Sequence, residues 1–368
     1  MKNNKIQFVT LYPNCPNYGL VKDVGQIPYT LGQSEHVDSY LASSFIDEQG
    51  EHKEIIENFS IIKLQKWSTF FSGFFFLLRN SRKFDWINIY HGGRRCYYWT
   101  RLYKLLNPKG RVYLKLDLSY SGCQMYEKSA KELKIFEKTI GISDIVSVES
   151  EKIRELTKRF TKYPIQVIPN GYISVDEQCI ERTLREKKFL TVGRLGTPEK
   201  ATDILLEAFA ASAKEHEWSL ELVGSIEESF KHEIDIFYKK YPELINRVIF
   251  KGPIYNREQL YAEYRSARTF VLPSRWEASP LVGPEALGNG CRMILSDAIP
   301  PIKELTNNLE FGRVVETGSV ESLKQALILE TRRTYSEVES QMIIEYAKNN
   351  LSWDSICDKL YALMIKKN

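Results

Sequence analysis

Two basic residues of the 368-residue chain, Arg194 and Lys200, stand in a turn where they could bind an anion. The turn follows a predicted strand at 188–192 and precedes a predicted helix through 204–213. Cations and backbone N–H groups at such a position can hold a diphosphate and stabilise negative charge that develops on it. The alternative is that both side chains are solvated loop cations.

Two carboxylates, Glu277 and Glu285, occur in a second segment with seven residues between them. Glu277 follows a predicted buried strand at 269–272, and Pro284 suits the first position of a helix, which would place Glu285 in the first turn. Unpaired N–H groups would then precede that helix at Leu281, Val282 and Gly283. Carboxylates so placed can accept hydrogen bonds from sugar and ribose hydroxyls, whereas the simpler interpretation is two surface acids.

The elements that would position these residues alternate between strand and helix in both halves. Predicted strands lie at 6–12, 61–64, 86–90, 111–116, 144–148 and 166–168, then at 188–192, 218–223, 248–251, 269–272, 292–296 and 312–316. Predicted helices include 97–106, 128–139, 226–238, 257–265, 284–288, 301–306 and 353–365. This alternation predicts an α/β fold of parallel, doubly wound sheets.

The length of the chain exceeds what one hydrophobic core usually supports, so two domains are expected. Pro169, Asn170 and Gly171 end the first half, and a hinge is predicted near 170–185. The first half is basic and the second acidic, which suggests different partners. We therefore predict domains at 1–175 and 176–351, followed by the last helix at 352–368.

Several motifs occur in a fixed order between about residues 165 and 310. They are Val167-Ile168-Pro169-Asn170-Gly171, Leu190-Thr191-Val192-Gly193-Arg194-Leu195 with Lys200, Phe270-Val271-Leu272-Pro273-Ser274, Glu277 with Glu285-Ala286-Leu287-Gly288, and Ile294-Leu295-Ser296-Asp297. Together they resemble the retaining glycosyltransferase family four, which has the GT-B fold of two Rossmann-like domains facing each other across a cleft.

The resemblance implies catalytic roles for Arg194, Lys200 and Glu277. The two cations would bind the donor diphosphate in place of a metal ion, and Glu277 would contact the donor sugar. The donor-binding set would comprise Gly25, Asn170, Gly193, Ser279, Pro280, Leu281, Val282 and Glu285, the last of which would bind the ribose. The final helix would cross back to the N-terminal domain. Ala201 departs from the family, which usually has glycine there.

The activity implied is transfer of a sugar from a nucleotide-diphosphate sugar, with UDP-sugars favoured, to a glycan, glycolipid or glycoprotein acceptor. Such transfer would serve cell-surface polysaccharide or glycoconjugate assembly, without a cofactor. The alternatives are an inactive scaffold subunit of a glycosyltransferase complex and a sugar-nucleotide epimerase. The residues of loop 278–280 leave the sugar unidentified.

The N-terminal half offers candidates for the acceptor side of the cleft. His91 and Asp117 each follow a predicted strand, and Lys22 and Asp23 lie in a predicted loop at 19–25 that would sit beside the donor phosphates. The alternatives are a structural histidine, a helix cap and an ordinary surface turn.

Residues 58–116 are rich in aromatic side chains and contain twelve Lys and Arg but one acid, Asp85. Such a segment can bind an anionic membrane surface, although a buried phenylalanine-rich helix is the alternative. Nucleic acid is not expected, because no known binding module is present. No run of apolar residues reaches the length of a membrane span. The six scattered cysteines form no CxxC pair, which indicates reduced thiols and no metal site. We therefore expect a cytoplasmic protein. If residues 58–116 bind lipid, it would attach peripherally to the inner face of the cell membrane.

Overall fold

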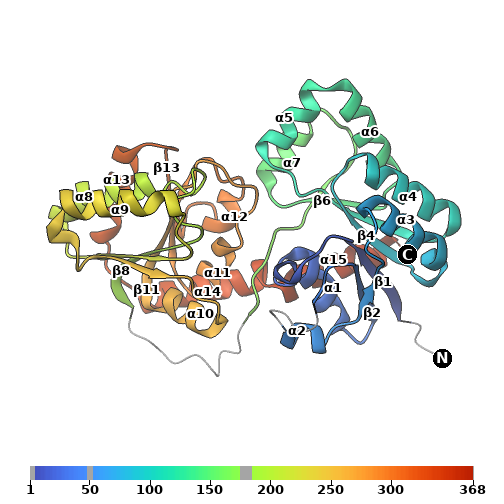
Figure 1. Cartoon of the computed structure of the whole chain (residues 1–368), viewed down its shortest axis with the longest axis horizontal. Coiled ribbons are helices and arrows are strands. Elements are labelled where there is room, and N and C mark those ends of the chain that lie inside the picture. Colours follow the sequence, from blue (N-terminus) through green and yellow to red (C-terminus); the bar gives the residue numbers. More distant parts are fainter. Residues whose placement is uncertain (1–4, 48–52, 175–184, 368) are drawn as a thin grey trace. The chain divides into compact units, whose positions relative to one another are not determined.

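The computed structural model describes residues 5–47, 53–174 and 185–367. The chain divides into two compact units (Figure 1). Unit 1 comprises residues 1–170 and 353–368, and unit 2 comprises residues 171–352. The boundary therefore falls between Asn170 and Gly171, whereas the sequence analysis placed it at 175/176.

Unit 1 is built on a parallel sheet of seven strands in the order β3-β2-β1-β4-β5-β6-β7. The strands are β1 Ile6–Leu11, β2 Val37–Ser43, β3 Ile61–Lys63, β4 Trp86–Tyr90, β5 Arg111–Lys115, β6 Ile145–Val148 and β7 Gln166–Val167. Sequence analysis missed β2, whose polar Asp38, Ser39 and Ser43 weaken its strand pattern. Its full-length pairing with β1 supplies the hydrogen bonds that make it a strand.

Helices cover the unit 1 sheet. They are α1 Asp23–Gly32, α2 Lys53–Glu57, α3 Thr69–Asn80, α4 Arg94–Leu106, α5 Tyr120–Lys128, α6 Ala130–Gly141, α7 Glu151–Thr157 and α15 Trp353–Lys367. The helix predicted at 128–139 corresponds to α6, which begins at Ala130 because the Ser129 side chain caps it there. The final helix α15 packs on α1, where Tyr361 stacks on His36.

Unit 2 is built on a parallel sheet of six strands in the order β10-β9-β8-β11-β12-β13. Its strands are β8 Glu186–Val192, β9 Ser219–Val223, β10 Val248–Gly252, β11 Ala267–Leu272, β12 Arg292–Ser296 and β13 Gly312–Val315. Its helices are α8 Thr202–Ser212, α9 Lys231–Lys240, α10 Arg257–Ser266, α11 Val282–Gly288, α12 Ile302–Thr306, α13 Val320–Thr331 and α14 Glu337–Leu351. All six strands agree with the prediction to within a few residues.

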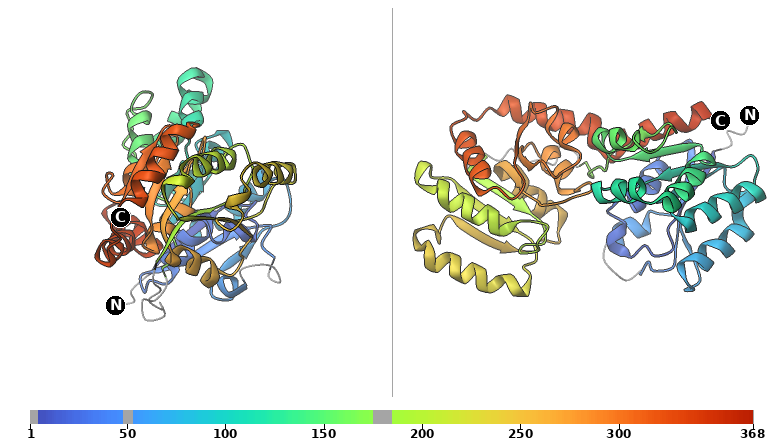
Figure 2. Two further views of the ribbon diagram at one scale, coloured as in Figure 1. Left: turned by 90° about the vertical axis from the view of Figure 1, so that its left-hand side faces the viewer. Right: turned by 90° about the horizontal axis from the view of Figure 1, so that it is seen from above.

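In each sheet, the direction in which successive strands are added reverses at one point. The chain builds outward from β1 in unit 1 and from β8 in unit 2, then returns to the other side of that strand with β4 or β11. Helices flank both faces of each sheet (Figure 2). The predicted fold class, α/β with two doubly wound sheets, is confirmed. Open sheets of this kind bind ligands where the strands end beside such a switch point.

Candidate functional site

The switch point of unit 2 is framed by the loops that follow β8 and β11. Lys200, from the first loop, lies with its Nζ 2.5 Å from Oε1 of Glu277, from the second. The Ser274 hydroxyl donates to the same carboxylate oxygen at 2.9 Å. Both members of the ion pair are largely buried, with 16% and 14% of their side chains exposed. The structure thus brings together two of the three residues predicted to be catalytic.

Arg194 lies in the same loop as Lys200 and forms an ion pair with Glu199. Its side chain is 63% exposed, so its guanidinium can exchange partners with a solute. A Cβ at Gly193 would lie 3.4 Å from Cε of Lys200, so the glycine lies against the lysine stem. Each of the two cations is therefore held by one carboxylate, and a diphosphate would compete with both carboxylates.

Arg275 fastens the two loops to each other, a role that sequence analysis missed. Its backbone N–H donates to the Glu199 carbonyl at 2.7 Å, and its guanidinium donates to the Pro198 carbonyl at 2.8 Å. The guanidinium also binds both carboxylate oxygens of Asp203, at 3.1 and 2.6 Å. The sequence offered one signal for this role, the position of Arg275 two residues before Glu277. The role itself could not be predicted, because the partners of Arg275 lie more than 70 residues away in the chain.

The turn after Lys200 has a strained backbone at Ala201. This residue is fully buried and adopts the left-handed conformation, with φ of 52°, immediately before α8. Left-handed backbone favours glycine, which explains why the resembled family usually has glycine here. Thr202 stabilises the turn, since its hydroxyl accepts from the Gly196 N–H at 2.9 Å.

Glu285 lies on α11 and accepts a hydrogen bond from the Tyr264 hydroxyl at 3.2 Å. Burial raises the pKa of Glu285 to about 7. Helix α11 begins at Val282 rather than at the predicted Pro284. The predicted free donor at Gly283 is also wrong, because this N–H donates to the Pro280 carbonyl at 3.2 Å.

The other residues predicted for the donor fall in two places. Ser279, Pro280, Leu281 and Val282 lie in the loop after β11 and at the start of α11. Gly25 and Asn170 belong to unit 1. Gly25 lies so close to Leu20 that a Cβ would come within 2.4 Å of its backbone, so packing alone requires this glycine.

In unit 1, His91 and Asp117 follow the neighbouring strands β4 and β5. Both adopt left-handed backbone, with φ of 69° and 48°. Asp117 is exposed, and the residue that caps α5 is Ser119, whose side chain accepts from the Gly122 N–H at 3.2 Å. The helix-cap alternative for Asp117 is therefore wrong. Strained non-glycine residues of this kind often mark functional sites.

Asp23 lies beside a buried lysine. It is the first residue of α1, so the predicted loop 19–25 ends at Lys22. Its Oδ2 is 3.8 Å from Nζ of Lys115, which is fully buried and also pairs with Glu149 at 2.9 Å. Burial, together with the nearby Asp117 charge, raises the pKa of Asp23 to about 6 against the opposing effect of Lys115. Sequence analysis missed Lys115, although a lysine within a buried strand requires a carboxylate partner.

The phenylalanine-rich part of residues 58–116 forms helix α3. One face of it is buried, through Phe76 and Leu77 among others, while Phe71 is 53% exposed. Trp67 and Tyr98 beside it are 47% and 54% exposed. The helix therefore has a core face, as the buried-helix alternative predicted, and also an exposed aromatic face.

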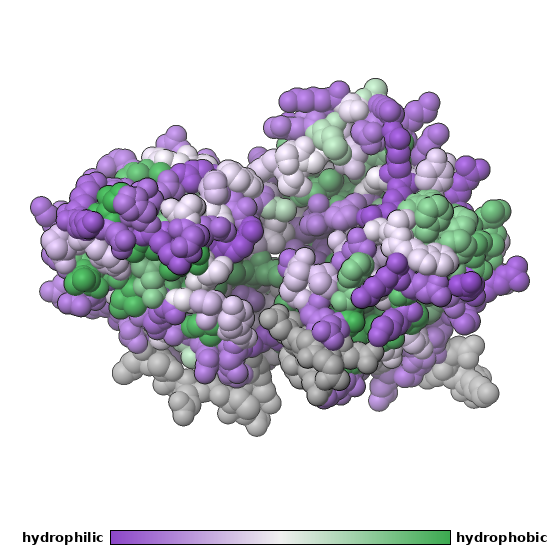
Figure 3. All heavy atoms as spheres, viewed as in Figure 1, coloured by the Kyte–Doolittle hydropathy of each residue, from purple (hydrophilic) through white to green (hydrophobic). Residues whose placement is uncertain are grey.

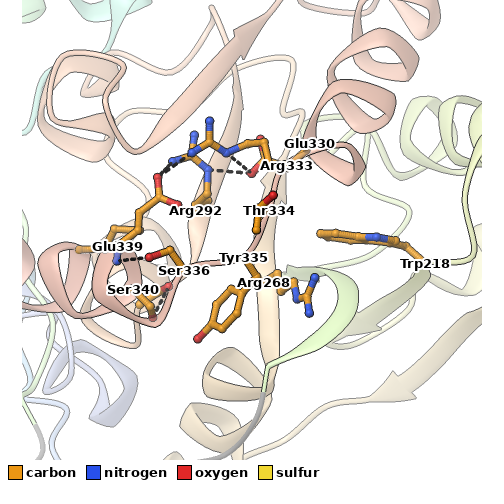
Figure 4. A pocket seen from close by; sticks show the side chains of 12 residues that line it. Trp218, Arg268, Arg292, Glu330, Arg333, Thr334, Tyr335, Ser336, Glu339 and Ser340 are labelled. Atoms are coloured by element: carbon orange, nitrogen blue, oxygen red, sulfur yellow. Dashed lines mark hydrogen bonds and ion pairs between the residues drawn. The ribbon is translucent and has the colours of Figure 1, made fainter.

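A pocket also lies at the opposite edge of unit 2, near the beginning of β12, but it has the features of a structural cluster (Figure 4). Its cavity volume is about 20 Å³, enough for a water molecule. Glu330 pairs with Arg292 at 2.7 Å, and Glu339 pairs with Arg333 at 2.9 Å. These matched charges fasten α13 and α14 to the sheet.

Three further features concern metal ions, membranes and thiols. Within the described ranges, no group of three or more His, Cys, Asp and Glu side chains is placed to hold a metal ion. In the same ranges, no helix has both the length and the apolar character required to cross a membrane. Free, buried cysteines occur at Cys15, Cys96, Cys123, Cys291 and Cys357, and Cys179 lies outside the described residues.

Part of the chain matches a known protein family, and two curated proteins are similar to it. Residues 176–349 match the family described as "Glycosyl transferases group 1". The chain is 30% identical over 231 residues to an uncharacterized glycosyltransferase of Haemophilus influenzae, a match that covers 61% of this chain and 60% of that protein. It is 23% identical over 264 residues to the poly(glycerol-phosphate) alpha-glucosyltransferase of Bacillus subtilis, covering 67% of this chain and 37% of the relative. The chain thus spans less than two thirds of the length of each relative.

Solved structures match both units. The lipopolysaccharide outer core galactosyltransferase WaaB matches with a TM-score of 0.71 at 15% identity, over 99% of this chain and all of that one. The Anabaena protein Alr3699/HepE in complex with UDP matches with a TM-score of 0.71 at 14% identity, over 98% of this chain and 100% of that one. These likenesses show the GT-B fold. The family match itself is confined to residues 176–349.

Proposed function

We propose that the chain is a retaining glycosyltransferase that moves a sugar from a nucleotide-diphosphate sugar to a glycan, glycolipid or glycoprotein acceptor. UDP-sugars are the favoured donors, because the similar Anabaena protein has been solved with UDP and with UDP-glucose. The similar lipopolysaccharide galactosyltransferase and poly(glycerol-phosphate) glucosyltransferase support a role in cell-surface polysaccharide or glycoconjugate assembly.

One observation carries this proposal: Arg194 and Lys200 lie at the switch point of unit 2, each paired with a carboxylate that a diphosphate can replace. A bound diphosphate would take over both cations and release Glu277 from Lys200. Glu277 could then accept hydrogen bonds from the hydroxyls of the donor sugar. Glu285, on the adjacent α11, would accept from the ribose.

In the proposed reaction, the acceptor oxygen bonds to the anomeric carbon on the face from which the diphosphate departs. The bond between that carbon and the phosphate oxygen breaks, and the acceptor proton passes to the departing phosphate. Arg194 and Lys200 stabilise the charge that develops on the diphosphate, the task that a metal ion performs in other transferases. The proposal is therefore a metal-independent enzyme.

The exposed face of α3 supports a peripheral membrane location for this activity. Phe71, Trp67 and Tyr98 are exposed there, and hydrophobic side chains gather near α3 on the face shown in Figure 3. Basic residues at 63, 66, 79, 82 and 83 flank the same helix. Aromatic and basic groups together bind anionic lipid surfaces, as a protein that acts on a lipid-linked acceptor would need.

The test is release of nucleoside diphosphate from a panel of UDP-, GDP- and ADP-sugars, with chelator present. We expect release from one donor, abolished in Glu277→Ala. Arg194→Ala should lower turnover about 100-fold with a much smaller change in donor affinity, because its charge acts on the leaving group. Lys231→Gln, which removes an exposed cation of α9, is the matched control and should leave turnover unchanged.

Each other outcome has a distinct meaning. An equal loss of turnover and donor affinity in Arg194→Ala would contradict the proposed role in the transition state. Formation of a free sugar isomer without acceptor would indicate an epimerase. Nucleotide binding without turnover, even with acceptor mixtures, would favour the scaffold subunit, and the absence of nucleotide binding would overturn the proposal.

A further inference from the structure

A cavity lies in unit 1 at the switch point between β1 and β4. Its volume is about 70 Å³, and its walls come from the end of β1, the end of β4 and the first turns of α3 and α4. Those segments contribute Tyr12, Asn14, Thr69, Tyr90, Arg95 and Trp99. The cavity therefore occupies the place in unit 1 that the loops of Lys200 and Glu277 occupy in unit 2.

Arg95 is the one charged residue among those that line this cavity. Its guanidinium lies over the Trp99 ring, 5.3 Å from the ring centroid. Its Nε is buried and has no hydrogen-bond partner among the residues that the structure describes. Within the same residues, no acidic side chain forms an ion pair with Arg95. A buried donor without a partner loses its hydrogen bonds to water and gains none in return, so a ligand that accepts from it would be favoured.

The remaining polar groups of the cavity are neutral. The Asn14 amide donates to the Thr69 hydroxyl at 2.6 Å, which holds both at the wall. Burial, with smaller contributions from Asp117 and Asp23, raises the pKa of Tyr12, so its hydroxyl remains protonated and can donate. Those two acids act on Tyr12 but do not line the cavity. The cavity thus presents a cation and hydroxyl donors without an anion.

We propose that this cavity binds a phosphate group carried by the acceptor substrate, an inference that rests on the proposed transferase function. A volume of about 70 Å³ holds roughly five water molecules, which suits a single phosphate rather than a whole ligand. The Nε of Arg95 belongs to the edge of the guanidinium that binds oxyanions in a bidentate manner. The remainder of the acceptor would lie outside the cavity.

The binding test uses inorganic phosphate as the probe. Arg194→Gln combined with Lys200→Gln provides the parent protein, so that the cations of unit 2 do not contribute. Phosphate should raise the unfolding temperature of this parent relative to chloride at equal ionic strength. Thr69→Asp places a carboxylate in the cavity, at the first position of α3, where an acidic residue stabilises a helix. It should weaken phosphate binding at least tenfold, whereas the neutral Thr69→Asn should not.

A second pair of variants tests the cation itself. Arg95→Gln should lose the phosphate effect, while Arg94→Gln, which removes a neighbouring exposed arginine, should keep it. If Arg95→Gln fails to fold, the two Thr69 variants decide the question, because the aspartate favours the helix. Equal stabilisation of Thr69→Asp and Thr69→Asn by phosphate would overturn the proposal.

Transfer assays separate this proposal from the proposed function. For a phosphate-bearing acceptor, KM should rise at least tenfold in Thr69→Asp relative to Thr69→Asn, with the donor KM unchanged. Equal acceptor KM values in the two variants would overturn the phosphate site and leave the transferase standing. If no donor releases its nucleotide while phosphate binding still depends on Thr69 and Arg95, the transferase proposal fails and the anion site remains.

Discussion

The carboxyl edges of the two sheets hold their charges in different ways. At the carboxyl edge of unit 1, Lys115 is fully buried and Glu149 is 2% exposed. At the corresponding edge of unit 2, Arg194 is 63% exposed and its partner Glu199 is 26% exposed. Charges of the first kind are fixed by the fold, since removing one partner leaves the other buried without a counter-charge and costs several kcal/mol. Charges of the second kind can exchange partners with a ligand, as the proposed donor site requires.

Unit 2 also contains a buried lysine, but this lysine shares its carboxylate partner with a second lysine. Lys188 pairs with Glu221 at 2.8 Å, but Lys251 lies 3.1 Å from the same carboxylate. The two lysines outweigh burial and lower the pKa of Glu221. In unit 1 one lysine serves two carboxylates, and burial raises the pKa of Glu149 despite Lys115. The unit 1 cluster therefore has one cation for two carboxylates, and the unit 2 cluster has a second cation.

The largest expected effect is a loss of stability when Lys115 is replaced. Lys115→Met leaves Glu149 and Asp23 buried without their cation, which should cost about 3 to 5 kcal/mol. Lys188→Met should cost at least about 1 kcal/mol less, because Lys251 still pairs with Glu221 and Glu263. Urea unfolding of both variants measures the difference. Equal losses would mean that the second lysine contributes nothing and would remove this distinction between the units.

How much of each unit could be predicted from the sequence depends on how far apart in the chain the interacting residues lie. The strands of unit 2, and the loops that carry Arg194, Lys200 and Glu277, were predictable because apolar runs and short turn motifs lie together in the chain. Arg275 was not, since its partners come from a distant loop. In unit 1, β2 was missed because its polar residues become a strand only through pairing with β1. The Arg95 cavity was missed because four separate segments form its walls.

An effect of intermediate size concerns Glu285, whose ionised form destabilises unit 2. Its folded-state pKa, about 7, lies above the ordinary value of 4.5, so the folded protein holds this proton more tightly than the unfolded chain does. Stability from the protonated form is therefore complete below about pH 4.5 and is lost as pH rises through 7. Glu285→Gln cannot ionise, so it should be more stable than the parent by roughly 3 kcal/mol at pH 8.

The measurement is the unfolding free energy of Glu285→Gln and its parent at pH 5 and pH 8. The advantage of the variant should grow between these values, while nucleotide binding should weaken because an amide replaces the carboxylate. Glu258→Gln, which removes a 61% exposed acid of α10, is the control and should show no such pH dependence. A constant difference across pH would contradict the raised pKa of Glu285.

The smallest expected effect tests whether the exchangeable charges of unit 2 depend on a fixed frame. Arg275→Lys keeps the positive charge but cannot bind both oxygens of Asp203 and the Pro198 carbonyl together. Because these bonds are largely exposed, the loss of stability should be only about 1 kcal/mol. The loop of Arg194 and Lys200 would nevertheless be less well positioned, so UDP affinity should fall about tenfold. This fall corresponds to about 1.4 kcal/mol of binding free energy.

Calorimetric titration with UDP measures that affinity, and Asp203→Asn serves as the reciprocal variant from the other side of the contact. The two substitutions should weaken binding to a similar extent, and their combination should add little, because both act on one contact. Additive losses would mean that Arg275 affects the nucleotide by a separate route. Unchanged affinity in both variants would show that the cations position themselves without the clamp, and the fixed frame would then be a feature of unit 1 alone.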